Sequence, residues 1–532
     1  MKGVPTTVLT ASLLLGLIQP SSLLAADPDL QKKVEALEHE LEALKKQVKE
    51  TDRKMEKVEG KSLGRWLTIS GDYRFRYDYM SGDVAPYYQL NPANTQADGS
   101  DLFIPVQGQN VKNKALYTNR FGLNLDAKAT QNVTVHARLL MYKISGAQDD
   151  AALRGSNGQT YFSDRAGIFD GTVGHVPGSS NLAVDQVYAT WRNIADQPLW
   201  FSIGRRPSTG GSPSHLKENN EKPGNSGVPQ LLVDYAFDGM TFGYAPDIDA
   251  LPGAYLKFCY GRGFENGITT KSGNGLSDTD MAGFNLVPYD TDNLRVEFQY
   301  NRGFNIFNTP VMLTGPFQGS APAVDLGDID WYGINLLGRI KHVGPGTLNW
   351  FISGGLSKTH PNDNTVKVQL QTPIDGFTTT AGLLDTQSGL MWTGAKENKT
   401  GNAVYLGCRY DLDGSRTKLG FEYNHGSKNW ITFAPASDDM WTSKVGTRGS
   451  VYEVYAIQEL LVEPISSFKS KAFFRLGYQY YDFDYTGSNN WVGAPTKMAD
   501  LTAMGAMGPS YGQMLTPLKN ASNFYATFEV HF

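Results

Sequence analysis

Charged side chains stand at every second position in many segments of this chain, with apolar residues between them. The segment 66–79 is typical, because Asp72, Arg74 and Arg76 alternate with aromatic rings. Such a ladder can line a wet path and choose between ions, since a ring of charges of one sign attracts the opposite ion. The same arginines could instead pair with neighbouring carboxylates and add only rigidity. The candidates for such a lining are Asp72, Arg74, Arg76, Arg120, Asp126, Arg138, Arg206, Arg295, Glu297, Arg339, Arg409, Glu422 and Arg475.

Other residue types that could do chemistry show no pattern that supports it. Cys259 and Cys408 form no CxxC or CxxCH motif, so neither a zinc knuckle nor a covalent haem is encoded, and they fall on opposite strand faces, which favours two unpaired thiols over a disulfide. The eight histidines, among them His215 and His425, belong to no recognisable Ser/His or Asp/His arrangement. The aspartates of segment 359–401 are too widely spaced for a calcium loop. We therefore expect no enzyme, no catalytic residue, no metal and no cofactor.

The alternation itself predicts the elements that position the charges. It recurs in about sixteen segments after residue 61, and long connections of roughly 17 to 43 residues (the first over 80–118) alternate with short turns. A soluble sandwich has no reason to follow that rule. We therefore predict an all-β fold, a transmembrane antiparallel β-barrel of about 16 strands whose apolar faces meet lipid. In the strand that runs from residue 230 to 244, a bulge at Asp238-Gly239 is the alternative to a continuous strand. The expected strands are 66–79, 120–128, 133–139, 187–191, 199–203, 231–237, 254–260, 284–286, 294–300, 332–336, 348–352, 404–410, 419–423, 452–456, 472–480 and 523–532.

Composition and charge agree with a barrel and exclude other classes. Charged residues make up 19% of the 532 residues, and a mean hydropathy of −0.35 is too polar for a bundle of membrane helices. The formal net charge of −5 gives no sign of a nucleic-acid partner.

The N-terminal region contains two further elements. Lys2, the apolar run 8–18 and the small residues before Asp27 have the layout of a secretory signal peptide over 1–26, too short for a membrane anchor. Residues 27–60 repeat apolar side chains at steps of four and three, which predicts a periplasmic coiled-coil helix and a homo-oligomer, with a trimer favoured. The alternative is a single amphipathic helix that lies against the barrel or in its mouth. The barrel itself is expected over residues 61–532. The seam of the coiled coil is Leu30, Val34, Leu37, Leu41, Leu44 and Val48.

The chain ends in an alternating strand with Phe528, Val530 and Phe532 on one face. This end is similar to the C-terminal signal that the barrel-insertion machinery reads in outer-membrane barrels. Together with the signal peptide it predicts the outer membrane of a Gram-negative bacterium, with the N-terminal segment in the periplasm and with lipid and lipopolysaccharide around the barrel.

A family resemblance rests on the segment 71–76 (GDYRFR), the segment 204–211 (GRRPSTGG) and the terminal Phe532. In these features and in its overall organisation the chain resembles the outer-membrane channel proteins of metal-reducing Gram-negative bacteria, the OmpJ-like porins with an N-terminal coiled coil. The resemblance implies a channel without catalytic residues and an association with respiration on extracellular acceptors.

These features together lead to an expected function. A barrel of about sixteen strands leaves an aqueous channel, so we expect a porin for passive diffusion of small polar solutes or ions, with a weak anion preference from its excess of arginine. The loop 207–229 is expected to fold inward and narrow the pore, with an exposed loop as the alternative. Two other functions stay open: a sleeve or scaffold that supports outer-membrane cytochromes in extracellular electron transfer, and an adhesin or receptor that acts through its loops.

Overall fold

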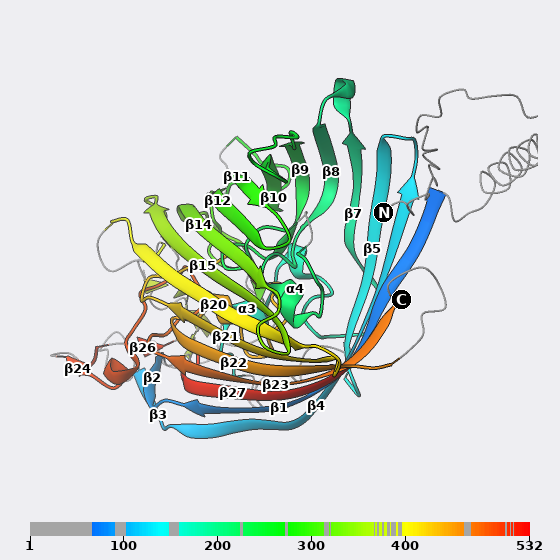
Figure 1. The fold of residues 1–532 in the computed structure, drawn as a ribbon. Coiled ribbons are helices and arrows are strands. Elements are labelled where there is room, and N and C mark those ends of the chain that lie inside the picture. The colour runs from blue at the N-terminus through cyan, green and yellow to red at the C-terminus, as the bar shows by residue number, and fades with distance from the viewer. Residues whose placement is uncertain are drawn as a thin grey trace, which may run out of the picture. The chain divides into compact units, whose positions relative to one another are not determined.

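The chain folds into a closed barrel of sixteen antiparallel strands that follow one another in sequence order around the wall. Figure 1 shows this order, with the short helix α4 (Ser214–Lys217) inside the curve of the wall. The predicted signal peptide over 1–26 and coiled coil over 27–60 lie outside the described residues. The computed structural model describes residues 66–90, 103–147, 159–223, 227–271, 275–312, 319, 321–365, 368–369, 372–374, 377–379, 383–384, 390–391, 396–461, 470–505, 508–510, 512–513 and 515–532.

The barrel wall alternates short turns at one end with longer connections at the other, as predicted. The connections carry short elements, and no helix in the described part of the chain is long and apolar enough to cross a membrane. The barrel strands are β1 (Leu67–Val84), β4 (Gln109–Lys128), β5 (Val133–Ile144), β7 (Ala183–Arg192), β8 (Leu199–Ser208), β9 (Tyr235–Tyr244), β10 (Tyr255–Phe264), β11 (Thr279–Asp290), β12 (Leu294–Phe304), β14 (Gly327–Ile340), β15 (Gly346–Pro361), β20 (Thr400–Leu412), β21 (Thr417–Gly426), β22 (Gly449–Glu459), β23 (Lys471–Phe483) and β27 (Leu518–His531). The short elements in the connections are β2 (Tyr87–Leu90), β3 (Phe103–Val106), α3 (Ser163–Ala166), β6 (Gly167–Ile168), β13 (Val311–Met312), β16 (Val368–Gln369), β17 (Thr372–Ile374), β18 (Phe377–Thr379), β19 (Leu383–Leu384), β24 (Met504–Gly505), β25 (Gly508–Pro509) and β26 (Gly512–Gln513), with single 3₁₀ turns at Asp170–Thr172, Ile194–Asp196, Lys444–Gly446 and Met498–Asp500.

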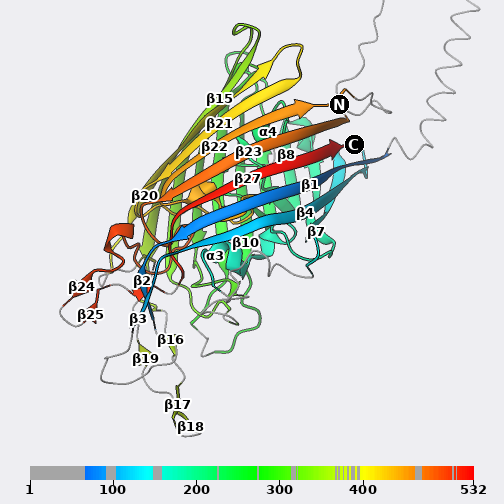
Figure 2. The same cartoon turned by 90° about the horizontal axis from the view of Figure 1, so that it is seen from below.

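The barrel closes between its first and last strands. Phe75 of β1 pairs with Phe528 of β27 on one side and with Asn119 of β4 on the other. The predicted fold class and strand number are confirmed, and each expected segment overlaps a barrel strand. β1 and β4 run farther than predicted and stay paired as far as Val84 and Gln109, so the first long connection is shorter than expected. Figure 2 places β2, β3, β24 and β25 beyond this end of the barrel.

Alternation separates the two faces of the wall. Phe75, Phe242, Phe284 and Leu476 are outward residues with exposed fractions of 38%, 46%, 50% and 52%. The inward neighbour Arg76 is only 1% exposed. A wall that shows aromatic and aliphatic side chains outside and buries charges inside is the reverse of a water-soluble fold, and it is the arrangement of a barrel that faces lipid.

β9 departs from the prediction in its first half. β8 and β9 pair without a register shift, so the alternative bulge at Asp238-Gly239 is wrong. Tyr235 and Phe237 were expected on the outer face, but they are 1% and 8% exposed and pack inward, and residues 231–234 precede the strand. The reason is that an apolar loop packs inside the barrel at this point, so the usual link between an apolar side chain and the outer face does not hold.

A hydrophobic cluster fills part of the barrel interior. It joins inward side chains of the wall, such as Trp331 and Phe351, to Leu232 and Phe433 on two inward-folded loops. The indole Nε1 of Trp331 donates a hydrogen bond of 2.9 Å to the carbonyl oxygen of Ile431, so its polar edge is satisfied although the ring is buried. This part of the interior is therefore a packed core.

Candidate functional site

The loop between β8 and β9, called loop 209–234 for its described residues 209–223 and 227–234, folds into the barrel and reaches the opposite wall. It contains α4, which Figure 1 shows inside the barrel. Gly211 stands where the two arms of the loop meet, because a Cβ there would lie 1.6 Å from the carbonyl oxygen of Val228. The structure thus places the loop predicted over 207–229 inside the barrel.

Basic residues of the opposite wall hold the tip of this loop by its carbonyl groups. Arg409 on β20 donates a hydrogen bond of 2.7 Å to the carbonyl oxygen of Leu216, and Arg475 on β23 donates to that of Lys217. The ammonium group of Lys217 forms an ion pair of 2.6 Å with Glu453. Arg409 and Arg475 were predicted to line a pore, but in the structure they fasten the loop to the wall.

A second loop, residues 427–448 between β21 and β22, also lies inside the barrel. The Lys444 ammonium group lies between two buried carboxylates of the wall, Glu422 and Glu453, and donates a hydrogen bond of 2.5 Å to Glu453. Burial alone would lower the pKa of Lys444, but the two carboxylates raise this pKa well above its ordinary value. The loop is therefore tied to the wall by a charged lysine that burial does not neutralise.

Two buried arginines hold the shape of this second loop through its backbone. Arg165 of α3 donates to the carbonyl oxygens of Pro435 at 2.8 Å and Asp439 at 3.0 Å. Arg448 donates to the carbonyl oxygen of Trp430 at 3.1 Å. Because these carbonyl groups are buried, each needs a donor, and the guanidinium groups supply several donors from one point.

Asp438 at the tip of the second loop meets three arginines of the wall. Arg74 donates a hydrogen bond of 3.0 Å to its Oδ1, and guanidinium nitrogens of Arg76 and Arg120 lie 3.9 and 3.8 Å from its Oδ2. The hydroxyl of Tyr142 donates to Oδ1 at 3.1 Å. Burial would raise the pKa of Asp438, but these arginines hold it well below its ordinary value. The carboxylate is therefore charged and shields the arginine cluster from other anions.

Most other lining candidates also form ion pairs with neighbours of opposite charge. Pairs of this kind cancel each other's field at a distance, so they contribute little to ion choice. The ion pairs are Arg138 with Asp72, Arg120 with Asp72, Arg295 with Asp290, Glu297 with Arg295, and Glu422 with Lys444. Asp126 lies 2.7 Å from the ring nitrogen Nδ1 of His136.

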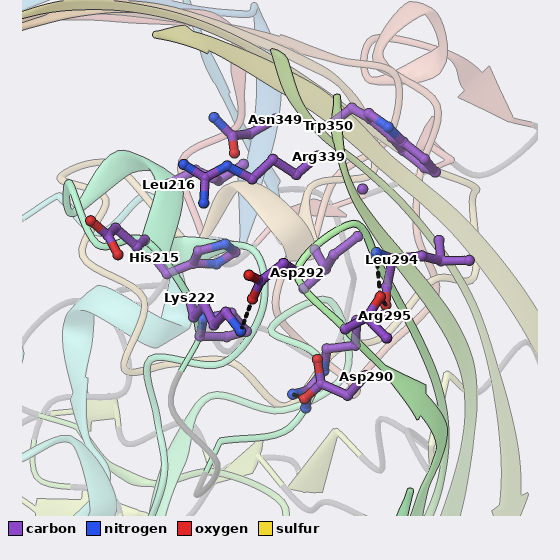
Figure 3. Close-up of a pocket in the computed structure, with 15 residues that line it drawn as sticks. His215, Leu216, Lys222, Asp290, Asp292, Leu294, Arg295, Arg339, Asn349 and Trp350 are labelled. Atoms are coloured by element: carbon purple, nitrogen blue, oxygen red, sulfur yellow. Dashed lines mark hydrogen bonds and ion pairs between the residues drawn. The ribbon is translucent and has the colours of Figure 1, made fainter. Parts of the chain in front are cut away.

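Arg206 and Arg339 are the exceptions among the predicted lining residues. Within the described part of the chain, neither guanidinium group has an ion pair or a hydrogen bond, and the Nε of each is buried without a partner. Arg206 lies near the rings of Tyr188 and Trp200, with its central carbon 5.6 and 5.8 Å from their centroids. Arg339 borders a cavity beside α4, shown in Figure 3. Among the predicted lining arginines, these two carry a positive charge that no carboxylate of the described residues balances.

The two cysteines are unpaired, and the metal-ligand residue types do not gather in the described part of the chain. Cys259 and Cys408 are both free thiols, as predicted. The hydroxyl of Thr241 lies 3.4 Å from the sulfur of Cys259. Among the residues that the structure describes, no group of three or more His, Cys, Asp and Glu side chains is arranged to hold a metal ion.

Sequence reasoning missed the second loop entirely. The connection between β21 and β22 contains Phe433, Asp438 and Lys444. The alternation of apolar and polar residues that identifies strands does not extend to connections, so it cannot identify the partners of these residues. One signal was present: Trp430 and Trp441 stand in the same connection. Large aromatic residues are seldom left in water, so their concentration in a supposed outer loop indicates burial against another surface.

Solved structures of known proteins match the fold at low similarity. OmpT of Vibrio cholerae, in its trimer form, has 11% identity and a TM-score of 0.36, over 88% of this chain and 100% of that one. An anion-selective porin from Comamonas acidovorans has 10% identity and a TM-score of 0.38, over 88% and 99%. OprB of Pseudomonas putida has 11% identity and a TM-score of 0.40, over 88% and 95%. At these scores the likeness carries no inference about solutes or partners.

Matches at the level of sequence come from one family model. No curated protein matches the chain. Residues 110–532 match the model of DUF3373, described as a protein of unknown function, and this stretch includes every barrel strand except β1 and a short part of β4. The chain therefore belongs to the DUF3373 family.

Proposed function

We propose that this protein is an outer-membrane channel through which small polar solutes and ions diffuse passively. One observation carries the proposal: a closed barrel of sixteen strands has an apolar outer wall and an inward-folded loop that narrows a charged interior. An apolar belt of this extent would drive association in water, but it suits a lipid environment. Passive diffusion needs no catalytic residue, and we assign none.

The pore of this channel is narrow for a barrel of this size. Loops 209–234 and 427–448 both occupy the interior, and they share a hydrophobic cluster with the wall. We infer a conductance well below that of an empty barrel with the same number of strands. We also infer a weak preference for anions, because Arg206 and Arg339 carry charge without a carboxylate partner whereas the other predicted lining arginines are paired with carboxylates.

The alternative function as a sleeve for electron-carrier proteins is less well supported. A cytochrome would have to enter the barrel, and the two inward-folded loops occupy space that it would need. An association with cytochromes outside the lumen would still agree with the resemblance to the OmpJ-like porins of metal-reducing bacteria. We therefore keep diffusion as the proposed function and cytochromes as partners to be sought by co-purification.

Targeting and assembly complete the proposal. The signal peptide over 1–26 and the aromatic C-terminal strand support placement in a Gram-negative outer membrane, among lipid and lipopolysaccharide, after delivery to the insertion machinery. The heptad seam over 27–60 supports a homo-oligomer, with a trimer favoured, and a periplasmic N-terminal segment.

Single-channel recording tests the proposed function. The mature protein, purified in detergent and shown to be folded by the shift of its gel mobility on heating, is added to planar bilayers under a potassium chloride gradient. We expect discrete small current steps, in groups of three for a trimer. The reversal potential is expected to shift toward the equilibrium potential of chloride. Folded protein that produces no current would contradict the proposal and would favour a closed barrel that serves another purpose.

A further inference from the structure

A cavity of about 90 Å³ lies between the tip of loop 209–234 and the wall near the turn from β11 to β12. Figure 3 shows His215 of α4 and Arg339 of β14 among the side chains that line it. A single water needs about 10–15 Å³ of such volume, so the cavity has room for several waters or for one small polyatomic ion. The residues that line it include His215, Leu216, Lys222, Arg295, Arg339 and Asn349.

The acidic groups at this cavity are mostly neutralised. Asp290 forms an ion pair of 2.9 Å with Arg295, and Asp292 forms one of 2.5 Å with Lys222, which Figure 3 marks. Glu221 stands at the exposed edge. The charge at the buried side of the cavity is therefore that of the guanidinium of Arg339, which has no ion pair or hydrogen bond with another described residue.

His215 adds a second polar group that faces the cavity without a protein partner. Its side chain is 5% exposed, and its Nδ1 is buried and has no hydrogen bond. Burial, with help from Arg409 and Arg295, lowers the pKa of His215 to about 3. The ring is therefore neutral at pH 7, when one of its nitrogens still carries a hydrogen that can be donated. A buried donor without a hydrogen-bond partner costs free energy, and an acceptor bound in the cavity would recover that cost.

We propose that this cavity binds a small oxyanion, a carboxylate or a phosphate, between Arg339 and His215. The guanidinium group offers a planar fork that matches two oxygens of such an anion, and the neutral ring offers one more hydrogen bond without adding charge. The proposal rests on the proposed function, because the cavity would then be a binding site for anions at the end of the lumen where the short turns lie. It adds a substrate class to that function: oxyanions that can accept several hydrogen bonds, in preference to chloride.

Calorimetry on the folded protein in detergent tests the site without any need for current. Inorganic phosphate is titrated into the full-length mature protein and into the variants Arg339→Gln, Arg339→Lys and Lys341→Gln. Lys341 is the matched control, since it is an exposed cation just past the end of β14. We expect saturable binding by the unchanged protein, at least tenfold weaker binding by Arg339→Gln, intermediate binding by Arg339→Lys, and no change for Lys341→Gln.

The outcomes separate the site from the channel. Saturable binding that depends on Arg339 supports the site, even if planar bilayers show no current and the channel proposal fails. An absence of saturable binding overturns the site, even if current flows. Equal loss in Arg339→Gln and Lys341→Gln also overturns it, because the effect would then be one of general charge. Heat-dependent gel mobility shows whether each variant is folded, and acetate in place of phosphate shows whether a carboxylate is accepted at the same residue.

Discussion

Arg74 on the first barrel strand donates a hydrogen bond of 3.0 Å to Asp438, which lies 364 residues later in the chain. The contact ties the second inward-folded loop to the wall and places a carboxylate among three arginines that would otherwise attract anions. The electrostatic field in the interior thus depends on a loop residue as much as on the wall.

Asp438→Asn is expected to increase the preference for anions. The change removes a negative charge within about 4 Å of Arg74, Arg76 and Arg120, and at that distance a unit charge is worth about 1 kcal/mol even in water, or about fivefold in a permeability ratio. Reversal potentials under a potassium chloride gradient measure the ratio. Asp413→Asn, in an exposed turn, is the matched control and should leave it unchanged. An equal shift in both variants would contradict the assigned role of Asp438.

Lys444→Met is expected to destabilise the barrel by about 3–5 kcal/mol, the usual effect of removing one partner from a buried ion pair. Glu422 and Glu453 are each 1% exposed, and the loss of Lys444 leaves Glu422 without its cation and Glu453 with Lys217 alone. The midpoint of the heat-induced change in gel mobility should fall. Adding Glu422→Gln should restore part of the loss, because it removes one of the two charges. No recovery in the double variant would point to lost packing instead.

Asp234→Asn is expected to stabilise the protein above pH 6 and to have no effect near pH 3.5. Burial raises the pKa of Asp234 from 3.8 to about 6, which His175 only partly offsets. Below pH 3.8 the carboxyl is protonated in the folded and unfolded states alike. As the pH rises from 3.8 to 6 only the unfolded chain releases the proton, so stability falls by about 3 kcal/mol and stays lower above that range. Melting midpoints of both proteins across this pH range measure the difference; curves that stay parallel would contradict it.

Phe433→Ala is expected to loosen the interior core. Phe433 is 3% exposed and packs against Tyr235, Phe237 and Trp331, and truncation of a buried phenylalanine costs about 3–5 kcal/mol. Loop 427–448 should then move more freely, which is expected to raise the conductance and its noise. Phe284→Ala, on the outer wall, is the control. If both variants change the current alike, the effect comes from the wall and not from the loop.

Deletion of residues 27–60 is expected to leave a folded barrel that no longer forms stable oligomers. The heptad seam over this segment is the source of the predicted association. Sedimentation in detergent and the grouping of current steps measure the oligomer. If the deletion variant remains a trimer, the contacts between protomers must lie on the barrel wall and not in residues 27–60.

The wall could be predicted from the sequence because its rule is local. A strand that faces lipid on one side and a polar interior on the other must alternate with a period of two, and Arg74, Phe75 and Arg76 show that period without reference to any distant residue. The prediction was wrong at Tyr235 and Phe237, where an aromatic side chain faces inward. The local rule identifies the apolar face of a strand, but it does not say whether lipid or a folded loop covers that face.

The sequence by itself determined the barrel, its strand order and the inward face of most charged residues, because these follow from alternation and the lengths of connections. Only the tertiary structure decided which of those charges remain free. Arg409 donates a hydrogen bond to the carbonyl oxygen of Leu216, and Arg74 donates one to Asp438. The guanidinium group of Arg339, in contrast, is unpaired and lines the same cavity as His215. The physical reason is that ion pairing depends on distances of a few ångströms between segments hundreds of residues apart, and these distances are set by how two loops pack inside the barrel.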